Sequence, residues 1–507
     1  MRWTWALLLT LAVAPRADAQ FRTRARSSPR PNIIFIFTDD HAVNAISAYG
    51  GRYNQTPHLD RIAREGMLFK SAFVTNAICG PSRATVLTGQ FGHLNGVPTN
   101  NDSLHPTTLT FPKLLRAAGY QTGLIGKWHL WTRPEGFDHF EILRDQGTYY
   151  NPLFYRPTDT VTVEGYTTDI ITDRALAWIE QRDTQKPFLL MFQHKAPHRP
   201  WDPGPNHLDQ DRQRYFPEAY SLFDDYATRG RPAREQEMMI GRHLNDRDLK
   251  FTPPPELSPT QLERWNRTYD PLNAAFRDSA LTDSALVRWK FQRYLGDYLR
   301  TVQSVDDNVG RLLNYLDDTG LAQNTIVIYS SDQGFFLGEH GWFDKRFMYE
   351  ESMRTPLMIR WPGVVQPGTV SDDLVQNLDY AETMLEMAGV GVPAAMQGRS
   401  LVPLLRGQRP ADWRNALYYQ YYEYPGWHMV RRHYGVRTNR FKLIHFYEID
   451  EWELYDLNRD PHELNNVYAL PDYKRTVYSM KRRLTQLREQ YKVPAVDAVP
   501  YAPREGR

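Results

Sequence analysis

The chain has 507 residues with 61 basic and 59 acidic side chains, and this near-neutral balance gives no reason to expect a nucleic-acid partner. The length allows one large domain or two unequal ones. A single cysteine excludes an intrachain disulfide, which is ordinary for a bacterial periplasmic protein and unusual for a secreted eukaryotic one.

The first 19 residues have the pattern of a secretory signal peptide. Arg2 precedes an apolar run over residues 5–13, and a small-x-small cleavage site follows at residues 17–19. The run is too short to span a bilayer, and no cysteine near residue 20 can carry a lipid anchor. We therefore expect cleavage near Ala19, a flexible basic segment over residues 20–31, and a periplasmic or secreted protein without a membrane anchor.

Residues 33–38 are a continuous apolar run, typical of a central parallel strand that is buried on both faces. Asp39 and Asp40 follow directly. Ligands of open α/β sheets gather beyond the C-terminal ends of the strands, and adjacent carboxylates there repel each other unless a cation lies between them. A solvated turn or a helix cap is the alternative interpretation of this pair.

A helix over residues 57–65 and a strand over residues 67–73 lead to the only cysteine. Pro81 suits the first turn of a helix and Gly89 suits its end, so Cys79 lies at the N-terminal edge of the helix with Arg83 one turn further on. A helix N-terminus beside a guanidinium can bind a tetrahedral oxyanion. The alternative is a buried spare thiol before an ordinary helix.

Three further predicted strands end in polar side chains that suit anion binding or proton transfer. The first lies just before Lys127, the second covers residues 187–192, and the third covers residues 325–331. The helices expected between and after them cover residues 109–118, 168–181, 285–316 and 378–388. Surface decoration is the alternative for Lys127 and His129, and a solvated turn is the alternative for Lys345. The polar residues concerned are Lys127, His129, His194, His198, Asp332, Gln333 and, further on, Lys345, and His194 suits a helper of the chemistry and a packed strand-end residue equally well.

These segments resemble the signatures of type I sulfatases. Residues 79–83 (CGPSR) with Thr88-Gly89 resemble the first signature and residues 126–129 (GKWH) the second, and the resemblance covers about residues 32–468. It implies an α/β fold of the alkaline phosphatase type, in which helices sandwich a large mixed, mostly parallel sheet and a small C-terminal antiparallel sheet with a helix packs beside it. It also implies that a formylglycine-generating or sulfatase-maturating enzyme oxidises Cys79 to formylglycine (3-oxoalanine), whose hydrate is the nucleophile.

The resemblance further assigns roles to the strand-end residues. A divalent cation would be bound by residue 79 and by four oxygen ligands, a set that favours Ca²⁺ and also suits Mg²⁺. Fixed positive charge would neutralise the sulfate, His198 would protonate the leaving alcohol, and His129 would take the proton whose loss expels sulfate. The four oxygen ligands are Asp39, Asp40, Asp332 and Gln333, and the three cationic side chains are Arg83, Lys127 and Lys345.

The chain is expected to divide into a catalytic domain (residues 32–400) and a C-terminal subdomain (residues 401–507). A long insertion over about residues 202–283 lies near the mouth of the site. Short strands are expected at residues 416–424, 433–437 and 441–446, followed by a terminal helix at residues 473–491.

The segments at residues 331–346, 434–438 and 450–455 resemble bacterial N-acetylglucosamine-6-sulfatases and mucin-desulfating sulfatases. They predict an exo-acting carbohydrate sulfatase, with 6-O-sulfated N-acetylglucosamine as the first expectation and uronate or galactose sulfates as alternatives. Trp427 and His428 are expected to stack on a sugar ring and to hydrogen-bond its hydroxyls. A formylglycine-dependent phosphoester or phosphonate hydrolase is a second hypothesis. A non-catalytic glycan-binding protein is a third, but it should lack one of these groups.

Overall fold

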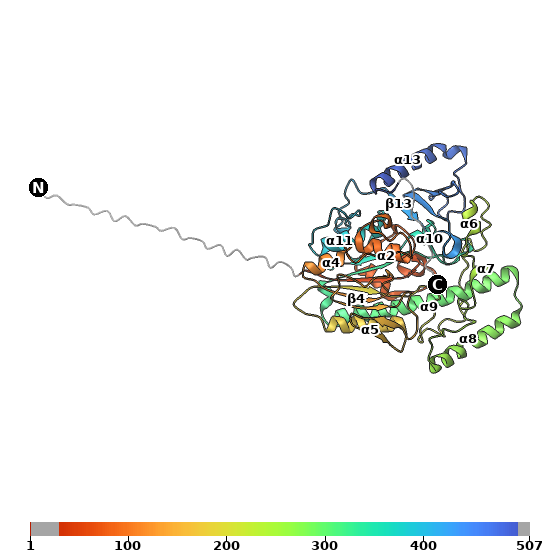
Figure 1. Cartoon of the computed structure of the whole chain (residues 1–507), viewed down its shortest axis with the longest axis horizontal. Helices are drawn as coiled ribbons and strands as arrows, with labels where there is room; N and C mark the ends of the chain where they lie inside the picture. The colour runs from red at the N-terminus through yellow and green to blue at the C-terminus, as the bar shows by residue number, and fades with distance from the viewer. Residues whose placement is uncertain (2–29, 495–507) are drawn as a thin grey trace.

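A ten-stranded mixed sheet forms the centre of the computed structural model, which describes Met1 and residues 30–494 (Figure 1). The predicted signal peptide and most of the predicted basic segment lie outside the described residues. The strand order is β11-β2-β10-β9-β1-β8-β4-β5-β6-β7. The five central strands from β9 to β5 are parallel, and antiparallel strands flank them on both sides. The predicted mixed, mostly parallel sheet is confirmed.

The strands of this sheet are short except near its middle. Their bounds are β1 Asn32–Thr38, β2 Met67–Phe69, β4 Gln121–Gly126, β5 His139–Leu143, β6 Leu153–Tyr155, β7 Thr160–Thr162, β8 Phe188–Gln193, β9 Thr325–Ser331, β10 Leu357–Arg360 and β11 Thr369–Ser371. A separate parallel pair is formed by β3 (Ala72–Phe73) and β12 (Val375–Gln376). The single strand expected at residues 67–73 is therefore two strands in two sheets.

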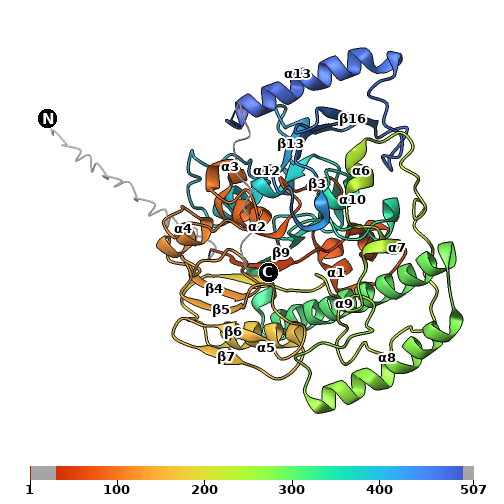
Figure 2. The same cartoon turned by 45° about the vertical axis from the view of Figure 1, so that its right-hand side comes forward.

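Helices cover both faces of the sheet, as the side chains of β1 show. Ile33, Phe35 and Phe37 pack into one apolar cluster, whereas Ile34 and Ile36 pack into the other. Since successive side chains of a strand point to opposite faces, a strand with no polar residue in this run must be covered on both sides. Figure 2 shows the two helical layers above and below the sheet.

The two helical layers come from different parts of the chain. One face carries α1 (Pro57–Glu65), α5 (Thr167–Glu180) and α9 (Asp283–Asp318). The other carries α2 (Cys79–Thr88), α4 (Phe111–Ala117), α11 (Tyr380–Met387) and α12 (Val402–Leu405). The remaining helices are α3 Gly92–Asn95, α6 Arg231–Glu235, α7 Ile240–His243, α8 Pro259–Ser279, α10 Glu350–Met353 and α13 Lys474–Gln490.

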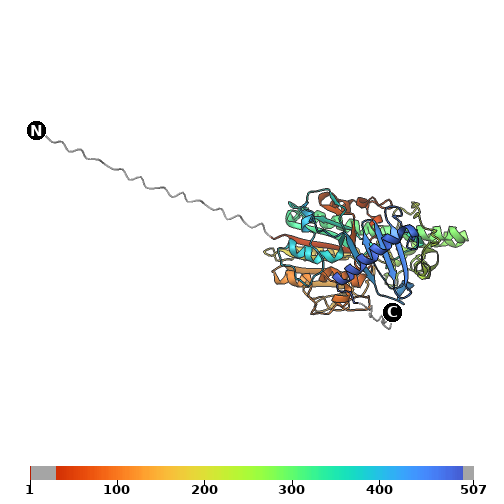
Figure 3. The same ribbon diagram turned by 90° about the horizontal axis from the view of Figure 1, so that it is seen from above.

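A second, four-stranded antiparallel sheet follows near the C-terminus, with the order β13-β14-β15-β16. Its strands are β13 Ala416–Tyr421, β14 His433–Thr438, β15 Phe441–Phe446 and β16 Glu451–Asp456. Helix α13 lies across this sheet and packs Met480, Leu484 and Leu487 onto it (Figure 3). The predicted small sheet and terminal helix are confirmed, and β16 is an additional strand that the sequence analysis did not anticipate.

The segment expected to be a long insertion is more regular than its composition indicates. It contains α8, a helix of 21 residues that begins with a capping box formed by Ser258 and Gln261. Apolar residues are sparse on this helix, and only Trp265, Tyr269 and Asn273 are buried. A helix with so narrow a buried face gives a weak periodic signal, which explains why the prediction missed it.

Candidate active site

The polar residues that follow the central strands lie at one edge of the large sheet. Thr38 at the end of β1 is opposite Ser331 at the end of β9, and Gln193 of β8 is opposite Gly126 at the end of β4. Asp39, Lys127 and Asp332 therefore leave neighbouring strands at the same level. Gly126 has a φ of +113°, and a Cβ there would lie 1.7 Å from the carbonyl oxygen of Gln193, so only glycine fits before Lys127.

Three buried carboxylates meet at this edge. Oxygens of Asp39, Asp40 and Asp332 lie within 4.8 Å of one another, and all three side chains are fully buried. The amide nitrogen of Gln333 donates to Asp40 Oδ1 at 2.6 Å, while Gln333 Oε1 is buried without a hydrogen-bond partner. Carboxylate and amide oxygens are the ligands of Ca²⁺ and Mg²⁺, and the orphan amide oxygen fits such an ion.

Each of these carboxylates also contacts one cationic side chain. Lys127 pairs with Asp39, Lys345 Nζ lies 2.7 Å from Asp40 Oδ2, and Arg83 lies 2.9 Å from Asp332 Oδ2. All three predicted sulfate-binding cations are thus in one buried network with three of the predicted metal ligands.

The carboxylates of this network do not all ionise equally easily. Burial and the charge of Asp39 raise the pKa of Asp332 to about 8, and burial raises that of Asp40 to about 6. For Asp39, burial raises the pKa, but Lys127 leads a group of cations that together bring it well below its usual value. A divalent cation would relieve the remaining repulsion among the three groups.

Cys79 is the first residue of α2 and lies against this network. Its Sγ is 3.4 Å from Asp39 Oδ1 and 3.6 Å from the amide nitrogen of Gln333. Burial, followed by the charge of Asp39, raises the pKa of the thiol to about 12. The Ser82 hydroxyl ties the first turn to the Asp332 carbonyl, and Asn100 Oδ1 accepts from the backbone N–H of residue 80 at 2.8 Å.

Two histidines flank the network. His198 Nε2 lies 3.8 Å from Asp40 Oδ2, and its Nδ1 lies 2.8 Å from the carbonyl oxygen of Arg199, which orients the ring. Burial lowers the pKa of His198 well below its usual value. On the other side, Gln146 bridges two predicted residues: its Oε1 accepts from Lys127 at 2.6 Å and its Nε2 lies 2.9 Å from His129 Nε2.

A cleft of about 430 Å³ leads from Cys79 to the surface. Its inner wall includes His198 and Lys345, and its mouth includes Trp427 and His428 from the loop between β13 and β14. Trp427 is 56% exposed, whereas His428 is buried with its Nε2 3.2 Å from Asp344 Oδ2. The predicted turn therefore does reach the site.

The insertion contributes to the same cleft. Asp248 binds Arg199 with both carboxylate oxygens, at 2.6 and 2.5 Å, and Arg247 binds Asp202 with an NH1–Oδ1 distance of 2.7 Å. The first of these ion pairs ties the insertion to the segment after β8, and the second joins the start of the insertion to its middle. Asn245 of the insertion also lines the cleft.

Several non-glycine residues around the cleft have left-handed backbone conformations. Such conformations cost free energy and persist where the surrounding structure enforces them, often at functional sites. They occur both in the segments that follow the central strands and at the mouth of the cleft. The residues are Asp40 (φ 67°), His129 (φ 55°), Asp344 (φ 78°), Arg346 (φ 91°) and His428 (φ 67°).

His194 is a predicted site residue that neither lines the cleft nor contacts the buried network of carboxylates and cations. Its side chain is fully buried, both ring nitrogens are without a hydrogen-bond partner, and burial lowers its pKa to about 3. Its ring contacts Phe192 edge-on at 4.4 Å. These contacts are those of a packed strand-end residue.

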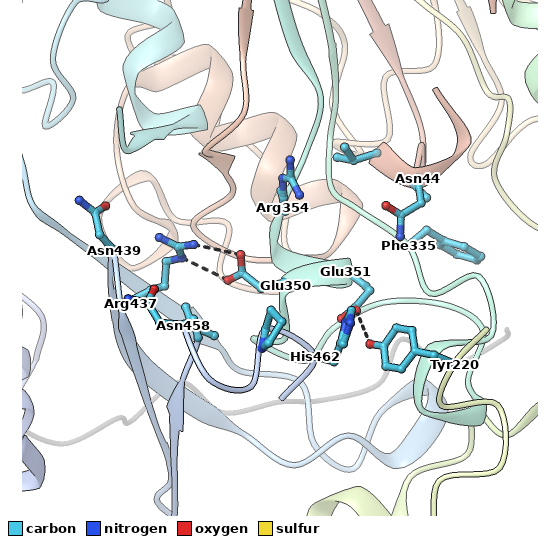
Figure 4. Close-up of a pocket in the computed structure, with 14 residues that line it drawn as sticks. Asn44, Tyr220, Phe335, Glu350, Glu351, Arg354, Arg437, Asn439, Asn458 and His462 are labelled. Carbon is cyan, nitrogen blue, oxygen red and sulfur yellow. Dashed lines mark hydrogen bonds and ion pairs between the residues drawn. The ribbon is translucent and has the colours of Figure 1, made fainter. Parts of the chain in front are cut away.

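A separate pocket of about 360 Å³ lies between residues 42–44, which follow β1, and the C-terminal sheet (Figure 4). Its Glu350 is already neutralised, because Arg437 donates to both carboxylate oxygens at 3.1 Å and Lys442 lies 2.9 Å away. Burial opposes ionisation, but Arg437 and Lys442 bring the pKa of Glu350 far below its usual value. This pocket lacks the strand-end network, and we do not assign the chemistry to it.

Comparison with known proteins agrees with this constellation. The sulfatase family profile matches residues 31–390, and the C-terminal profile of N-sulphoglucosamine sulphohydrolase matches residues 338–490. The chain belongs to the sulfatase family. It is accordingly a hydrolase of sulfuric esters.

Individual relatives cover nearly the whole chain. An N-acetylglucosamine-6-O-sulfatase of Bacteroides thetaiotaomicron is 49% identical over 96% of this chain and 91% of its own length. A structure solved with its substrate D-glucosamine-2-N,6-O-disulfate superposes with a TM-score of 0.91 and 48% identity, covering 93% of this chain and 100% of that chain. The human N-acetylglucosamine-6-sulfatase is 29% identical over 78% of this chain and 68% of its own length.

The sequence analysis missed several residues of this cleft, including the four considered next. Gln146 and Asn100 lie in irregular segments with no motif around them, so no sequence signal marks them. Asp344 and Arg346 flank Lys345, and they line the cleft beside His428. Their charge beside the matched lysine was a usable signal.

Proposed function

We propose that this protein is an exported, formylglycine-dependent sulfatase that removes 6-O-sulfate from N-acetylglucosamine or glucosamine residues at the ends of sulfated glycans. The substrate assignment rests on the 49% identity to an N-acetylglucosamine-6-O-sulfatase over nearly the full length of both chains. The related structure bound to a 6-O-sulfated glucosamine supports the same substrate class.

Asp39, Asp40, Asp332 and Gln333 would hold a Ca²⁺ ion, or Mg²⁺, together with residue 79. The unpartnered Gln333 Oε1 and the crowded carboxylates support this assignment. The bound ion would add positive charge beside the sulfate oxygens and make a nearby hydroxyl more acidic.

Formylglycine at position 79 would supply, when hydrated, one hydroxyl that attacks sulfur and a second whose deprotonation releases sulfate. A cellular formylglycine-generating or sulfatase-maturating enzyme would be the partner that installs it. Arg83, Lys127 and Lys345 neutralise the sulfate by fixed positive charge. Their carboxylate partners hold these long side chains in place before substrate arrives.

The two histidines divide the proton transfers. His198 faces the cleft with Nε2 and is oriented through Nδ1, so it is placed to protonate the departing sugar oxygen. His129 lies on the opposite side of the network, where Gln146 fixes its orientation. It is placed to take the proton whose removal releases sulfate from residue 79.

The sugar itself would meet the mouth of the cleft. The exposed face of Trp427 is available to stack on a sugar ring, and the His428–Asp344 pair lines the cleft beside it, where it would contact the sugar hydroxyls. Arg346 lines the same wall. A uronate or galactose sulfate remains the alternative substrate.

A formylglycine-dependent phosphonate or phosphoester hydrolase is the remaining alternative reaction. A phosphonate monoester hydrolase of Agrobacterium radiobacter has a TM-score of 0.68 to this chain over 91% of this chain and 96% of its own, but 21% identity supports only a shared fold.

A substrate panel tests the proposal. Purified mature protein is assayed on 6-O-, 4-O- and 3-O-sulfated N-acetylglucosamine, on galactose and uronate sulfates, on an aryl sulfate, and on matched phosphate esters. The expected result is the highest kcat/KM on 6-O-sulfated N-acetylglucosamine. Activity confined to aryl sulfates or phosphate esters would contradict the assignment.

Peptide mass spectrometry tests the two processing steps. The peptide carrying residue 79 should lose about 18 Da, the mass change set by oxidation of a thiol to an aldehyde. The mature N-terminus should lie near Gln20. An active protein with an unmodified Cys79 would overturn the formylglycine assignment.

A further inference from the structure

A second hollow lies on the outer side of α9, away from the cleft at Cys79. It has a volume of about 300 Å³ and is bounded by α8, the first half of α9 and residues 212–216. Among the described residues, none lines both this hollow and the cleft. Figures 1 and 2 show α8 running beside the first half of α9 at the periphery of the molecule. We call this hollow the arginine groove after its four guanidinium groups, which belong to Arg212, Arg214, Arg293 and Arg300.

One buried carboxylate serves two of these guanidinium groups. Asp297 Oδ1 accepts from Arg212 at 3.0 Å and from Arg300 at 3.3 Å, and the Tyr269 hydroxyl donates to the same oxygen at 2.8 Å. Burial, followed by the charge of Arg212, lowers the pKa of Arg300 from its usual value. Two guanidinium groups therefore share one carboxylate, and this part of the groove carries uncompensated positive charge. A buried cation without its own anion is costly.

The other two guanidinium groups have less compensation. Arg293 donates to neutral oxygens of Leu249 and Asn273, each at 3.1 Å, and it forms no ion pair within the described chain. Arg214 approaches Asp211 only to 3.8 Å, and this pair is 39% and 59% exposed. Exposed pairs of this kind contribute little. The groove thus has a surplus of donors suited to an added anion.

An aromatic wall completes the groove. The rings of Phe276 on α8 and Trp289 on α9 stack with their centroids 3.9 Å apart, and the guanidinium of Arg293 lies 5.0 Å from the Trp289 ring. Both aromatic side chains are partly exposed. Gly296 lies in the floor, where a Cβ would come within 2.9 Å of the Arg300 guanidinium, so the absence of a side chain keeps the floor open.

We propose that the arginine groove is a non-catalytic binding site for a sulfated saccharide. Guanidinium groups bind sulfate oxygens in pairs, and partly exposed aromatic faces pack against the apolar faces of sugar rings. The volume suits one or two sugar residues. This inference goes beyond hydrolysis at residue 79, because the groove would hold a second sulfated segment of glycan without acting on it.

Binding in a protein that cannot turn over its substrate tests the proposal. The probe is a defined N-acetylglucosamine-containing tetrasaccharide with several sulfate groups, titrated by calorimetry into the mature protein carrying Cys79→Ala. Two classes of site are expected, and saturation of the cleft with a 6-O-sulfated monosaccharide should leave the second. Arg214→Gln and Arg293→Gln should each weaken that second site by about five- to tenfold, because each removes a charge-assisted donor.

Arg277→Gln is the matched control, since Arg277 is an exposed residue of α8 that does not line the groove. It should leave both sites unchanged. A single class of site, or an equal loss in the Arg277→Gln protein, would overturn the proposal. If Arg293→Gln lowers the melting temperature, Arg214→Gln decides alone, because Arg214 is 39% exposed and loosely paired.

This design distinguishes a failure of the groove proposal from a failure of the proposed catalytic function. With Cys79 intact, groove variants should hydrolyse a monosaccharide 6-sulfate with unchanged kcat and KM. Absence of that hydrolysis in the unsubstituted protein would count against the proposed function and not against the groove.

Discussion

The floor and the mouth of the cleft are built by different means. At the floor, Asp39, Asp40 and Asp332 follow regular strands and are fully buried. At the mouth, Trp427 and His428 lie on a loop of the C-terminal sheet, and Asn245 comes from the insertion. Under the proposed function, the groups that act on every sulfate ester would be placed by the parallel sheet, whereas the groups that meet the sugar would be placed by loops, where sequence can vary without disturbing the core.

This contrast predicts that floor variants affect all substrates equally and mouth variants do not. The largest effect is expected for Cys79→Ala, which removes the residue proposed to become the nucleophile. Turnover of sugar and aryl sulfates should fall alike, by at least about 10³-fold. Initial rates on both substrates check this, with the melting temperature as control for the fold. Substantial residual activity on either substrate would break the assignment of Cys79.

Asp332→Asn should be nearly as damaging, and it should also lower stability. It removes one hard ligand and leaves the buried Arg83 without its carboxylate partner. Loss of one partner of a buried pair costs about 3–5 kcal/mol of unfolding free energy. Elemental analysis should find the divalent cation lost, and denaturant unfolding should show the destabilisation.

The control for this variant is Asp173→Asn, since Asp173 is 60% exposed in a surface pair with Arg311. It should change neither metal content nor stability by more than about 0.5 kcal/mol. Full metal occupancy in an active Asp332→Asn protein would contradict the metal assignment.

Gln146→Leu should have an intermediate effect. It removes the amide that joins Lys127 to His129 without removing either residue. We expect kcat to fall about 10- to 100-fold on sugar and aryl sulfates alike, because both side chains lose their orientation. Gln146→Glu should not restore the rate, since a carboxylate accepts from Lys127 but cannot donate to a ring nitrogen of His129. Unchanged kcat in both variants would show that Gln146 does not position Lys127 and His129 for the reaction.

His428→Ala should have the smallest effect and the only one that depends on the substrate. It removes the ring that lies 3.2 Å from Asp344 at the mouth. KM for 6-O-sulfated N-acetylglucosamine should rise about tenfold, as expected for loss of one hydrogen bond to a charged network. The aryl sulfate should be affected much less. Equal changes for both substrates would show that the mouth does not select the sugar.

The sequence was most informative where the fold is most regular. Residues 33–38 predicted a central strand because a continuous apolar run of that length is typical of a strand buried on both faces. The strand is found at Asn32–Thr38. Residues 57–65 predicted a helix with the observed bounds. The signatures around Cys79 and Lys127 attached a chemical hypothesis to the start of α2 and to the segment after β4.

Elements and residues placed by long-range contacts were not predictable in the same way. Strands β6 and β7 have three residues each; β6 forms by pairing with β5, and β7 forms by pairing with β6. Gln146 reaches Lys127 and His129 from an irregular segment, so its role follows from tertiary structure alone. His194 illustrates the opposite limit, since a histidine after a strand has the same sequence pattern whether it faces a cleft or the core.

The burial of α2 has a consequence for how the enzyme is made. All ten residues of this helix are buried, and Cys79 is 1% exposed. A maturating enzyme would need access to the cysteine, and the folded protein buries it together with the rest of α2. Oxidation of Cys79 would therefore precede folding of the central sheet, and a chain that folds first would be locked in an inactive form. The yield of active enzyme would then depend on the rate of maturation relative to the rate of folding during biosynthesis.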